Sequence, residues 1–222
     1  MKGIILYKSK YGATKKYAQW LQEATGFDCM ELKNADIRQV EAYDTIILGG
    51  GVYASGIAGL SFFRKNKERL QGKKLLIFFV GASPYDEKAM EQAKEHNLKE
   101  DLKDIPIFYC RGSWDEDSMS MVDRNLCRML QKAVAKMDPA TYEPWMSALM
   151  CAVGQKCDWT DPACLEPLLK ELGLKYRRIH ENTGYICFQL RNHKAIRTLD
   201  RRGTVLRHSG KQNSGREDTG TI

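Results

Sequence analysis

The chain has 222 residues, of which 43% are hydrophobic and 28% are charged, a composition that excludes a wholly disordered protein. Its longest apolar stretches, residues 75–82 and 145–154, are much shorter than the roughly 20 residues of a membrane-spanning helix, and the run at residues 4–7 is too short for a signal peptide, so we expect a soluble, cytoplasmic protein. The net charge of +7 describes a C-terminal extension and not the domain before it, because residues 174–222 hold 11 Lys and Arg against 4 Asp and Glu whereas residues 1–173 hold 24 of each.

Short apolar runs alternate with segments of helical periodicity from Lys2 to Met137. The predicted strands are residues 2–9, 28–32, 44–49, 74–80 and 105–111, and the predicted helices are residues 14–25, 35–42, 57–70, 86–95 and 118–137. In the last helix one apolar face is marked by Met119, Val122, Leu126, Met129, Leu130, Ala133 and Met137. Near-continuous apolar strands separated by helices are typical of a parallel sheet covered on both faces. The sequence therefore predicts a three-layer, doubly wound α/β domain.

The end of the chain differs in character from this domain. We expect a last helix before Gly173, and then the basic extension, which gives predicted domains of residues 1–173 and 174–222. Within the extension, residues 185–190 and 195–206 favour strands, and residues 209–222 have the composition of a disordered segment. Its charge leaves open a peripheral contact with the inner face of an anionic membrane, and we expect no specific nucleic-acid partner.

The loop between the first strand and the first helix predicts a phosphate site. Its residues are Ser9, Lys10, Tyr11, Gly12, Ala13 and Thr14. In a parallel sheet, ligands bind beyond the carboxyl ends of the strands, and this loop combines two hydroxyls with N–H groups at a helix N-terminus. The Walker pattern with its lysine is absent, as is the G-x-G-x-x-G dinucleotide pattern. A phosphate monoester is the ligand that remains, although a simple strand-to-helix turn with an N-cap explains the loop equally well.

Two further strand ends carry glycines and aromatic residues. We expect a loop after the third strand, starting at Gly49, with candidate binding residues at its centre: Gly50, Gly51, Val52, Tyr53 and Ala54. The loop after the fourth strand adds Ser83 and Tyr85. Glycine lets the backbone approach a ligand closely, and the two tyrosines could cover opposite faces of a flat ring. Together, the three loops predict a pocket for a planar heterocycle on a phosphorylated stalk.

At this point the sequence resembles the flavodoxins, and among them proteins similar to menaquinone-dependent protoporphyrinogen dehydrogenase. The resemblance depends on residues 7–21 (YKSKYGATKKYAQWL), 43–56 (YDTIILGGGVYASG) and 154–172 (GQKCDWTDPACLEPLLKEL), and it covers about residues 1–173. It implies strand order 2-1-3-4-5, FMN as cofactor, and electron transfer in heme biosynthesis with a redox partner or a quinone or porphyrin-type substrate. The sequence departs from many flavodoxins at Tyr11 and Ala13, and its domain is neutral where flavodoxins are acidic.

Other classes of activity find less support in the residues. The four histidines, His96, His180, His193 and His208, lie outside the three strand ends, so we predict no hydrolytic triad and no catalytic side chain, because the chemistry would belong to the flavin. A phospho-receiver needs acidic residues where this chain has Lys8-Ser9 and Gly49-Gly50. The alternative that stays open is a flavin-free flavodoxin fold that serves as an interaction or regulatory module.

The seven cysteines predict neither a metal site nor a disulfide framework. They form no C-x-x-C pair, and no nearby histidine completes a four-ligand set with Cys151, Cys157 and Cys164. Reduced thiols are the expectation for a chain without a secretory signal.

Overall fold

A computed structural model describes residues 2–53, 55–99 and 102–174 of the chain. Its central sheet consists of parallel strands β1 (Gly3–Lys8), β2 (Asp28–Glu31), β3 (Thr45–Tyr53), β5 (Lys74–Gly81) and β6 (Ile107–Arg111) in the order β2-β1-β3-β5-β6. A short strand, β4 (Gly56–Ile57), pairs antiparallel with the end of β3. Counted along the parallel strands, this order is 2-1-3-4-5, so the predicted α/β fold class and strand order are confirmed.

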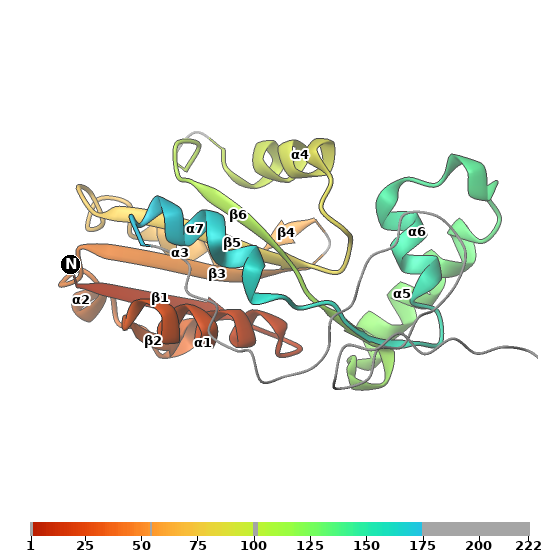
Figure 1. Ribbon diagram of the computed structural model, residues 1–222, viewed down its shortest axis with the longest axis horizontal. Coiled ribbons are helices and arrows are strands. Elements are labelled where there is room, and N and C mark those ends of the chain that lie inside the picture. The colour runs from red at the N-terminus through yellow and green to blue at the C-terminus, as the bar shows by residue number, and fades with distance from the viewer. Residues whose placement is uncertain (1, 54, 100–101, 175–222) are drawn as a thin grey trace, which may run out of the picture. The chain divides into compact units, whose positions relative to one another are not determined.

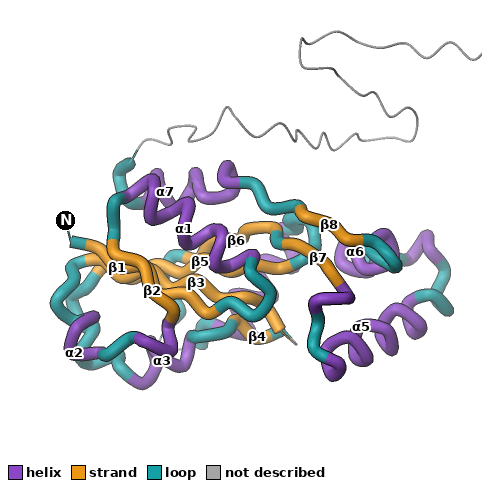
Figure 2. The backbone as a smooth tube through the Cα atoms, turned by 90° about the horizontal axis from the view of Figure 1, so that it is seen from below, coloured by secondary structure: helices purple, strands orange, loops and turns teal. Residues whose placement is uncertain are grey.

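Helices cover both faces of this sheet (Figures 1 and 2). They are α1 (Ala13–Thr25), α2 (Ile37–Val40), α3 (Leu60–Lys65), α4 (Glu87–Asn97) and α7 (Glu166–Glu171), and single turns of 3-10 helix are η1 (Leu32–Asn34), η2 (Glu116–Ser118), η3 (Pro139–Thr141) and η4 (Pro162–Leu165). Successive strand side chains point to opposite faces. Ile5 and Ile47 therefore pack with the leucines of η4 and α7 in one apolar cluster. Ile46 and Leu48 pack with α3 in the other.

The predicted helix over residues 118–137 lies elsewhere than a regular βα alternation would place it. It forms α5 (Met121–Val134), which belongs to an insert bounded by the antiparallel strands β7 (Ser113–Asp115) and β8 (Lys156–Asp158) and also contains α6 (Pro144–Cys151). Figure 1 shows α5 and α6 standing away from the central sheet. The sheet face beside α1 is covered instead by α7, where Leu168 is fully buried. The shorter helix, through its buried Leu168 and Leu169, thus covers the sheet in place of the longer one.

The described residues end at Leu174, just after α7. Gly173, with a φ of 75°, follows the last turn of that helix, as is common at helix ends. The strands expected over residues 185–190 and 195–206, and the disorder expected over residues 209–222, lie outside the described residues, and the domain boundary at residue 173 stays a prediction. No helix within the described part of the chain is both long enough and apolar enough to cross a bilayer.

Candidate functional site

The β1–α1 loop builds an anion-binding geometry from its backbone. Gly12 has a φ of 94°, which a residue with a side chain rarely adopts, and it is the N-cap of α1. The Ser9 Oγ accepts a hydrogen bond from the Gly12 N–H at 3.1 Å, which fixes the turn. The first turn of α1 contains no acidic residue, and Thr14 is buried within it. The N–H groups at the start of α1 are therefore not opposed by a carboxylate of their own helix. Such a helix start can accept an anion such as phosphate.

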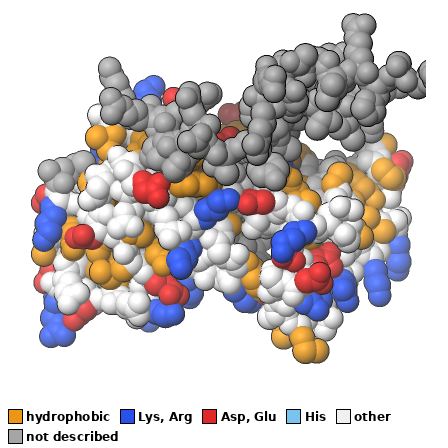
Figure 3. All heavy atoms as spheres, turned by 60° about the horizontal axis from the view of Figure 1, so that its bottom comes forward, with side chains coloured by type: hydrophobic (Ala, Val, Ile, Leu, Met, Phe, Trp, Pro, Cys, Tyr) orange, Lys and Arg blue, Asp and Glu red, His pale blue; other side chains and the backbone are white. Residues whose placement is uncertain are grey.

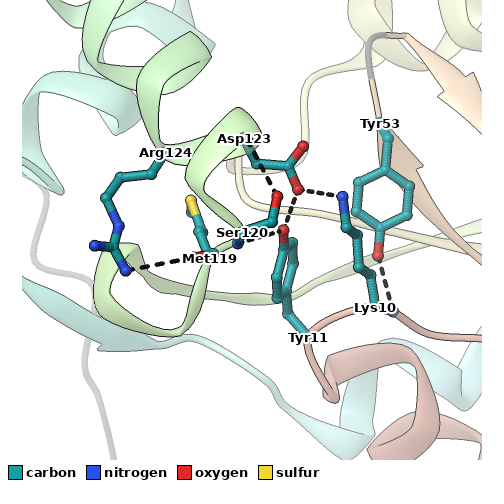
Figure 4. Close-up of polar contacts among 7 residues, drawn as sticks. All are labelled: Lys10, Tyr11, Tyr53, Met119, Ser120, Asp123 and Arg124. Carbon is teal, nitrogen blue, oxygen red and sulfur yellow. Dashed lines mark hydrogen bonds and ion pairs between the residues drawn. The ribbon is translucent and has the colours of Figure 1, made fainter.

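Lys10 and Tyr11, from the same loop, reach across to the insert (Figure 4). The Lys10 ammonium and the Tyr11 hydroxyl both donate to one oxygen of Asp123, in the first turn of α5. The hydrogen bond from Lys10 has the largest effect and that from Tyr11 the next, and together they hold the pKa of Asp123 below its ordinary value. The same carboxylate raises the pKa of Lys10. The N–H of Asp123 is itself capped by the Ser120 Oγ at 3.2 Å. The loop and the insert are thus joined by one shared carboxylate.

Tyr53 stands on the other side of Lys10. The backbone N–H of Lys10 donates to the Tyr53 hydroxyl at 3.1 Å, and the Tyr11 and Tyr53 rings meet edge to face with centroids 6.3 Å apart. The Lys10 Nζ lies 5.8 Å from the Tyr53 ring centroid, within range of a cation–π interaction. Tyr53 is 36% exposed, so part of its side chain is accessible to a ligand.

The predicted glycine loop after the third strand is wrong, because β3 continues through these residues to Tyr53 and turns back as β4. Packing explains the glycines: a Cβ on Gly50 would lie 2.3 Å from the Ala58 carbonyl oxygen, and one on Gly51 would lie 2.6 Å from the Tyr53 hydroxyl. Val52 pairs with Ile57 across this hairpin, and Ala54 lies outside the described residues. The glycines therefore admit neighbouring parts of the chain and do not form a flexible loop.

A side chain that sequence reasoning missed holds this hairpin in place. Asn97, at the end of α4, is 5% exposed, and its Oδ1 accepts from the Ile57 N–H at 2.8 Å. Its Nδ2 donates to the Ser55 carbonyl at 2.9 Å, while Ser55 itself adopts a φ of 67°. Asn97 lies two residues beyond the predicted helix over residues 86–95 and belongs to no distinguishing motif, so the sequence carries no signal for this role.

The loop after β5 is fixed by β6. The Tyr109 hydroxyl donates to the Ser83 carbonyl at 2.5 Å, and the Arg111 Nε donates to the Ala82 carbonyl at 3.1 Å. Tyr85 is 66% exposed, and its ring centroid lies 6.4 Å from that of Tyr109. Burial raises the pKa of Tyr109, so its hydroxyl stays protonated and serves as a donor.

The predicted site residues fall into two groups. A cavity of about 800 Å³ brings Val52, Ser83 and Tyr85 together with Tyr109 and one side of α4. The phosphate-loop residues and Tyr53 do not line this cavity, and they gather instead around Lys10 and Asp123 (Figure 4). Asp123 was missed because its sequence signal, Ser120-x-x-Asp123, indicates only a helix cap. Among the described residues, no cluster of His, Cys, Asp and Glu has the arrangement of a metal site.

Comparison with known proteins agrees with this architecture. The sequence pattern described as "Flavodoxin domain" matches residues 4–141. No curated protein matches the chain. Similar solved structures include the two-electron reduced flavodoxin of Megasphaera elsdenii, at 20% identity over 48% of this chain and 82% of that chain with a TM-score of 0.37. Another is the WrbA-like flavodoxin from Agrobacterium tumefaciens, at 20% identity over 58% of this chain and 91% of that one with a TM-score of 0.36.

A third is a Fusobacterium nucleatum flavodoxin bound to flavin mononucleotide, at 22% identity over 36% of this chain and 53% of that chain with a TM-score of 0.30. The family assignment depends on the domain match and not on these structures. That match spans more than half of the sequence, including β1, the β1–α1 loop and all the parallel strands of the sheet after it. This chain belongs to the flavodoxin-domain family.

Proposed function

We propose that this protein binds FMN at the carboxyl edge of its sheet and transfers electrons through it. The observation that carries the proposal is the β1–α1 loop, where the N-terminus of a 13-residue helix opens between Ser9 and Thr14, next to the half-exposed ring of Tyr53. Oriented N–H groups and a helix dipole favour a phosphate dianion. Membership in the flavodoxin-domain family makes FMN the phosphate monoester that fits.

Each side chain of the loop has a separate task in this proposal. Ser9 and the N–H groups at the start of α1 hold the phosphate, whereas the Lys10 ammonium pairs with Asp123 and joins the loop to the insert. The Lys10 N–H orients Tyr53 through its hydroxyl, so that the ring is positioned before the ligand arrives. When bound, FMN supplies the electron-transfer chemistry, and the protein contributes position and electrostatics.

The finer proposal is an oxidoreductase of the protoporphyrinogen dehydrogenase type, with a quinone as acceptor. It is supported by the segment around Asp158-Trp159-Thr160-Asp161, which resembles that subfamily. The Lys16 ammonium of α1 donates to Asp158 at 2.9 Å and to Thr160 at 2.7 Å, while the Asp161 N–H donates to the Tyr17 hydroxyl at 3.0 Å. The segment therefore packs against the same helix that begins at the phosphate loop.

The absorption spectrum of the purified protein tests the proposal. We expect flavin absorption, and chromatography of the released cofactor should identify FMN and not FAD, because one phosphate-binding loop is built and no adenosine site accompanies it in the described residues. The subfamily is tested separately, by following the oxidation of protoporphyrinogen IX to fluorescent protoporphyrin IX with a soluble quinone. Protein that stays colourless after reconstitution with FMN would favour the flavin-free interaction module.

A further inference from the structure

Helix α5 exposes an apolar face that no described part of the molecule covers. The exposed fractions of its large apolar side chains are 78% for Met121, 77% for Val122, 51% for Leu126, 63% for Met129 and 40% for Leu130, and Met137, three residues after the helix ends, is 43% exposed. Isolated apolar residues on a surface are ordinary, but a contiguous patch indicates an interaction site. We call these residues the α5 surface.

The opposite side of α5 is firmly packed, so this exposure does not reflect a loosely held helix. Val134 is 2% exposed, and the Gln131 Nε2 donates to Glu116 at 2.7 Å. The Tyr142 hydroxyl donates to the Val134 carbonyl at 3.0 Å, which fixes the end of the helix. With 3.6 residues per turn, Val122, Met129 and Ala133 fall on the side away from Gln131 and Val134. The α5 surface is therefore presented outward by a helix whose other side is anchored.

Two lysines lie beside this apolar stripe near the end of the helix. Lys132 and Lys136 are four residues apart and therefore lie on the same side. Arg124 instead donates to the carbonyls of Glu116, Asp117 and Met119, and Arg128 pairs with Glu116. Asp123 is the one acidic residue of α5, and its carboxylate is occupied by Lys10 and Tyr11. On the right of the molecule, where Figure 1 places α5, Figure 3 shows hydrophobic side chains among basic and acidic ones. The outward side of α5 thus combines methionine, leucine and valine with positive charge.

We propose that the α5 surface docks this protein onto an anionic lipid bilayer, with the helix lying in the plane of the interface. Interfacial helices have this composition: an apolar stripe enters the acyl boundary while Lys and Arg meet the anionic headgroups. The long stems of Lys132 and Lys136 allow their ammonium groups to reach the headgroups beside the buried stripe. A second copy of the chain is a poorer occupant, because Lys132 and Lys136 of one copy would lie near the same lysines of the other.

Docking through α5 also has a consequence for the candidate site. Asp123, in the first turn of α5, contacts Lys10 and Tyr11 of the phosphate loop, so the docked helix begins next to that loop (Figure 4). An electron acceptor dissolved in the membrane would be close to the cofactor. This consequence rests on the proposed function, whereas the docking itself does not.

Co-sedimentation of the full-length protein with vesicles tests the proposal. Vesicles of phosphatidylglycerol and phosphatidylcholine should bind the protein, and vesicles of phosphatidylcholine alone should bind it more weakly. Replacing Leu126 and Met129 by Gln should weaken binding at least about tenfold, because two apolar side chains no longer enter the interface. The matched control is Leu174→Gln, an exposed leucine (37%) outside the insert, which should leave binding unchanged.

The charge contribution is tested in the same way. Lys132→Gln with Lys136→Gln should weaken binding to anionic vesicles about tenfold, and high salt should abolish the difference. The control removes the same charge elsewhere, through Lys88→Gln with Lys103→Gln, both exposed positions outside the insert. Circular dichroism verifies that every variant is folded.

Several outcomes would overturn the docking proposal. One is that the full-length protein does not bind anionic vesicles. Another is that the variant with Gln at positions 126 and 129 binds them as tightly as the wild type. A third is that the wild type forms a dimer in solution and the same substitutions dissociate it. A protein that binds vesicles through α5 but contains no flavin would refute the proposed function and leave the docking intact. Protein that contains flavin but binds vesicles equally well when α5 is changed would refute the docking proposal and leave the proposed function intact.

Discussion

At the scale of single residues, the candidate site depends on side chains that satisfy the backbone of a turn while leaving donors for a ligand. Ser9 accepts from the Gly12 N–H, and its own hydroxyl hydrogen is still available to an anion. Thr14 is buried at the first turn of α1, and Lys10 is oriented by Tyr53 and Asp123. The geometry of the loop therefore exists before a ligand is present.

Ser9→Ala combined with Thr14→Ala should weaken FMN binding at least about tenfold, since hydrogen bonds to a charged group contribute roughly 1.5–3 kcal/mol each. Flavin fluorescence quenching during titration of the apoprotein measures the dissociation constant. Ser147→Ala is a suitable control, because Ser147 is an exposed serine of α6 and lies outside the three loops of the candidate site. An unchanged dissociation constant in the double variant would place the phosphate elsewhere.

Cys164 links pH to stability. The S–H of Cys110 donates to its sulfur, and the pKa of Cys164 falls from 9.0 to about 6. A group whose pKa is lower in the folded protein stabilises the fold fully above its unfolded pKa, and this contribution disappears as the pH falls through the folded value. The free energy of unfolding that Cys164→Ser removes should therefore be largest near pH 9 and should shrink towards pH 6.

Urea unfolding at several pH values measures this difference for Cys164→Ser. Cys151→Ser, which changes an exposed thiol, provides the control. A loss of stability that is the same at every pH would show that Cys164 contributes by packing alone.

At the scale of elements, the β3–β4 hairpin shows how close packing explains a glycine-rich sequence. Gly49 lies beneath the Phe78 ring, where a Cβ would come within 2.2 Å of it, and Gly50 lies against the backbone of Ala58. Asn97 then closes the hairpin onto α4 with buried hydrogen bonds. These contacts restrict the hairpin, and the restricted hairpin in turn fixes the position of Tyr53.

Gly50→Ala should lower the free energy of unfolding by about 1–3 kcal/mol or more, because the new methyl would overlap backbone that cannot easily move. Gly56→Ala is the matched control in the same hairpin, since its Cβ would lie 3.5 Å from the Tyr53 carbonyl oxygen, an ordinary contact. Urea denaturation of both variants, compared with the wild type, measures the effect. Equal stability of the two variants would mean that the hairpin can shift to make room.

At the scale of the whole molecule, the described residues comprise the central sheet with its covering helices and the insert that contains α5 and α6. The sequence continues into the predicted basic extension. The sheet and its covering helices are complete at Gly173, with the leucines of α7 buried against β1 and β5. The extension carries all of the net charge. Its proposed contribution is electrostatic attraction to the inner face of the membrane, which would add to docking through α5.

A protein of residues 1–173 should therefore remain folded and should retain FMN with the affinity of the full chain, because no predicted binding residue lies beyond Tyr85. Absorption spectroscopy and thermal denaturation of the truncated protein check this expectation. Loss of flavin or precipitation on truncation would show that the extension packs on the domain and that the boundary lies further along the chain.

The sequence by itself determined the fold class and the edge of the sheet that carries the candidate site. Uninterrupted apolar strands such as residues 45–48 and 76–80 can only be buried between two layers of helices, and parallel strands bring their carboxyl ends to one edge. For this reason the fold class and the position of the β1–α1 loop could be predicted. Family resemblance added the strand order and the cofactor, which periodicity alone does not reveal.

The tertiary structure decided which surfaces meet. Periodicity in α5 shows which side of the helix avoids water, but not what covers that side, so the sequence predicted a buried helix where the structure presents an exposed one. Likewise, Asp123 reaches Lys10 and Tyr11 across more than a hundred residues, and the glycines of β3 serve contacts with Phe78 and Ala58. Such contacts join residues that are distant along the chain, and therefore no local pattern encodes them.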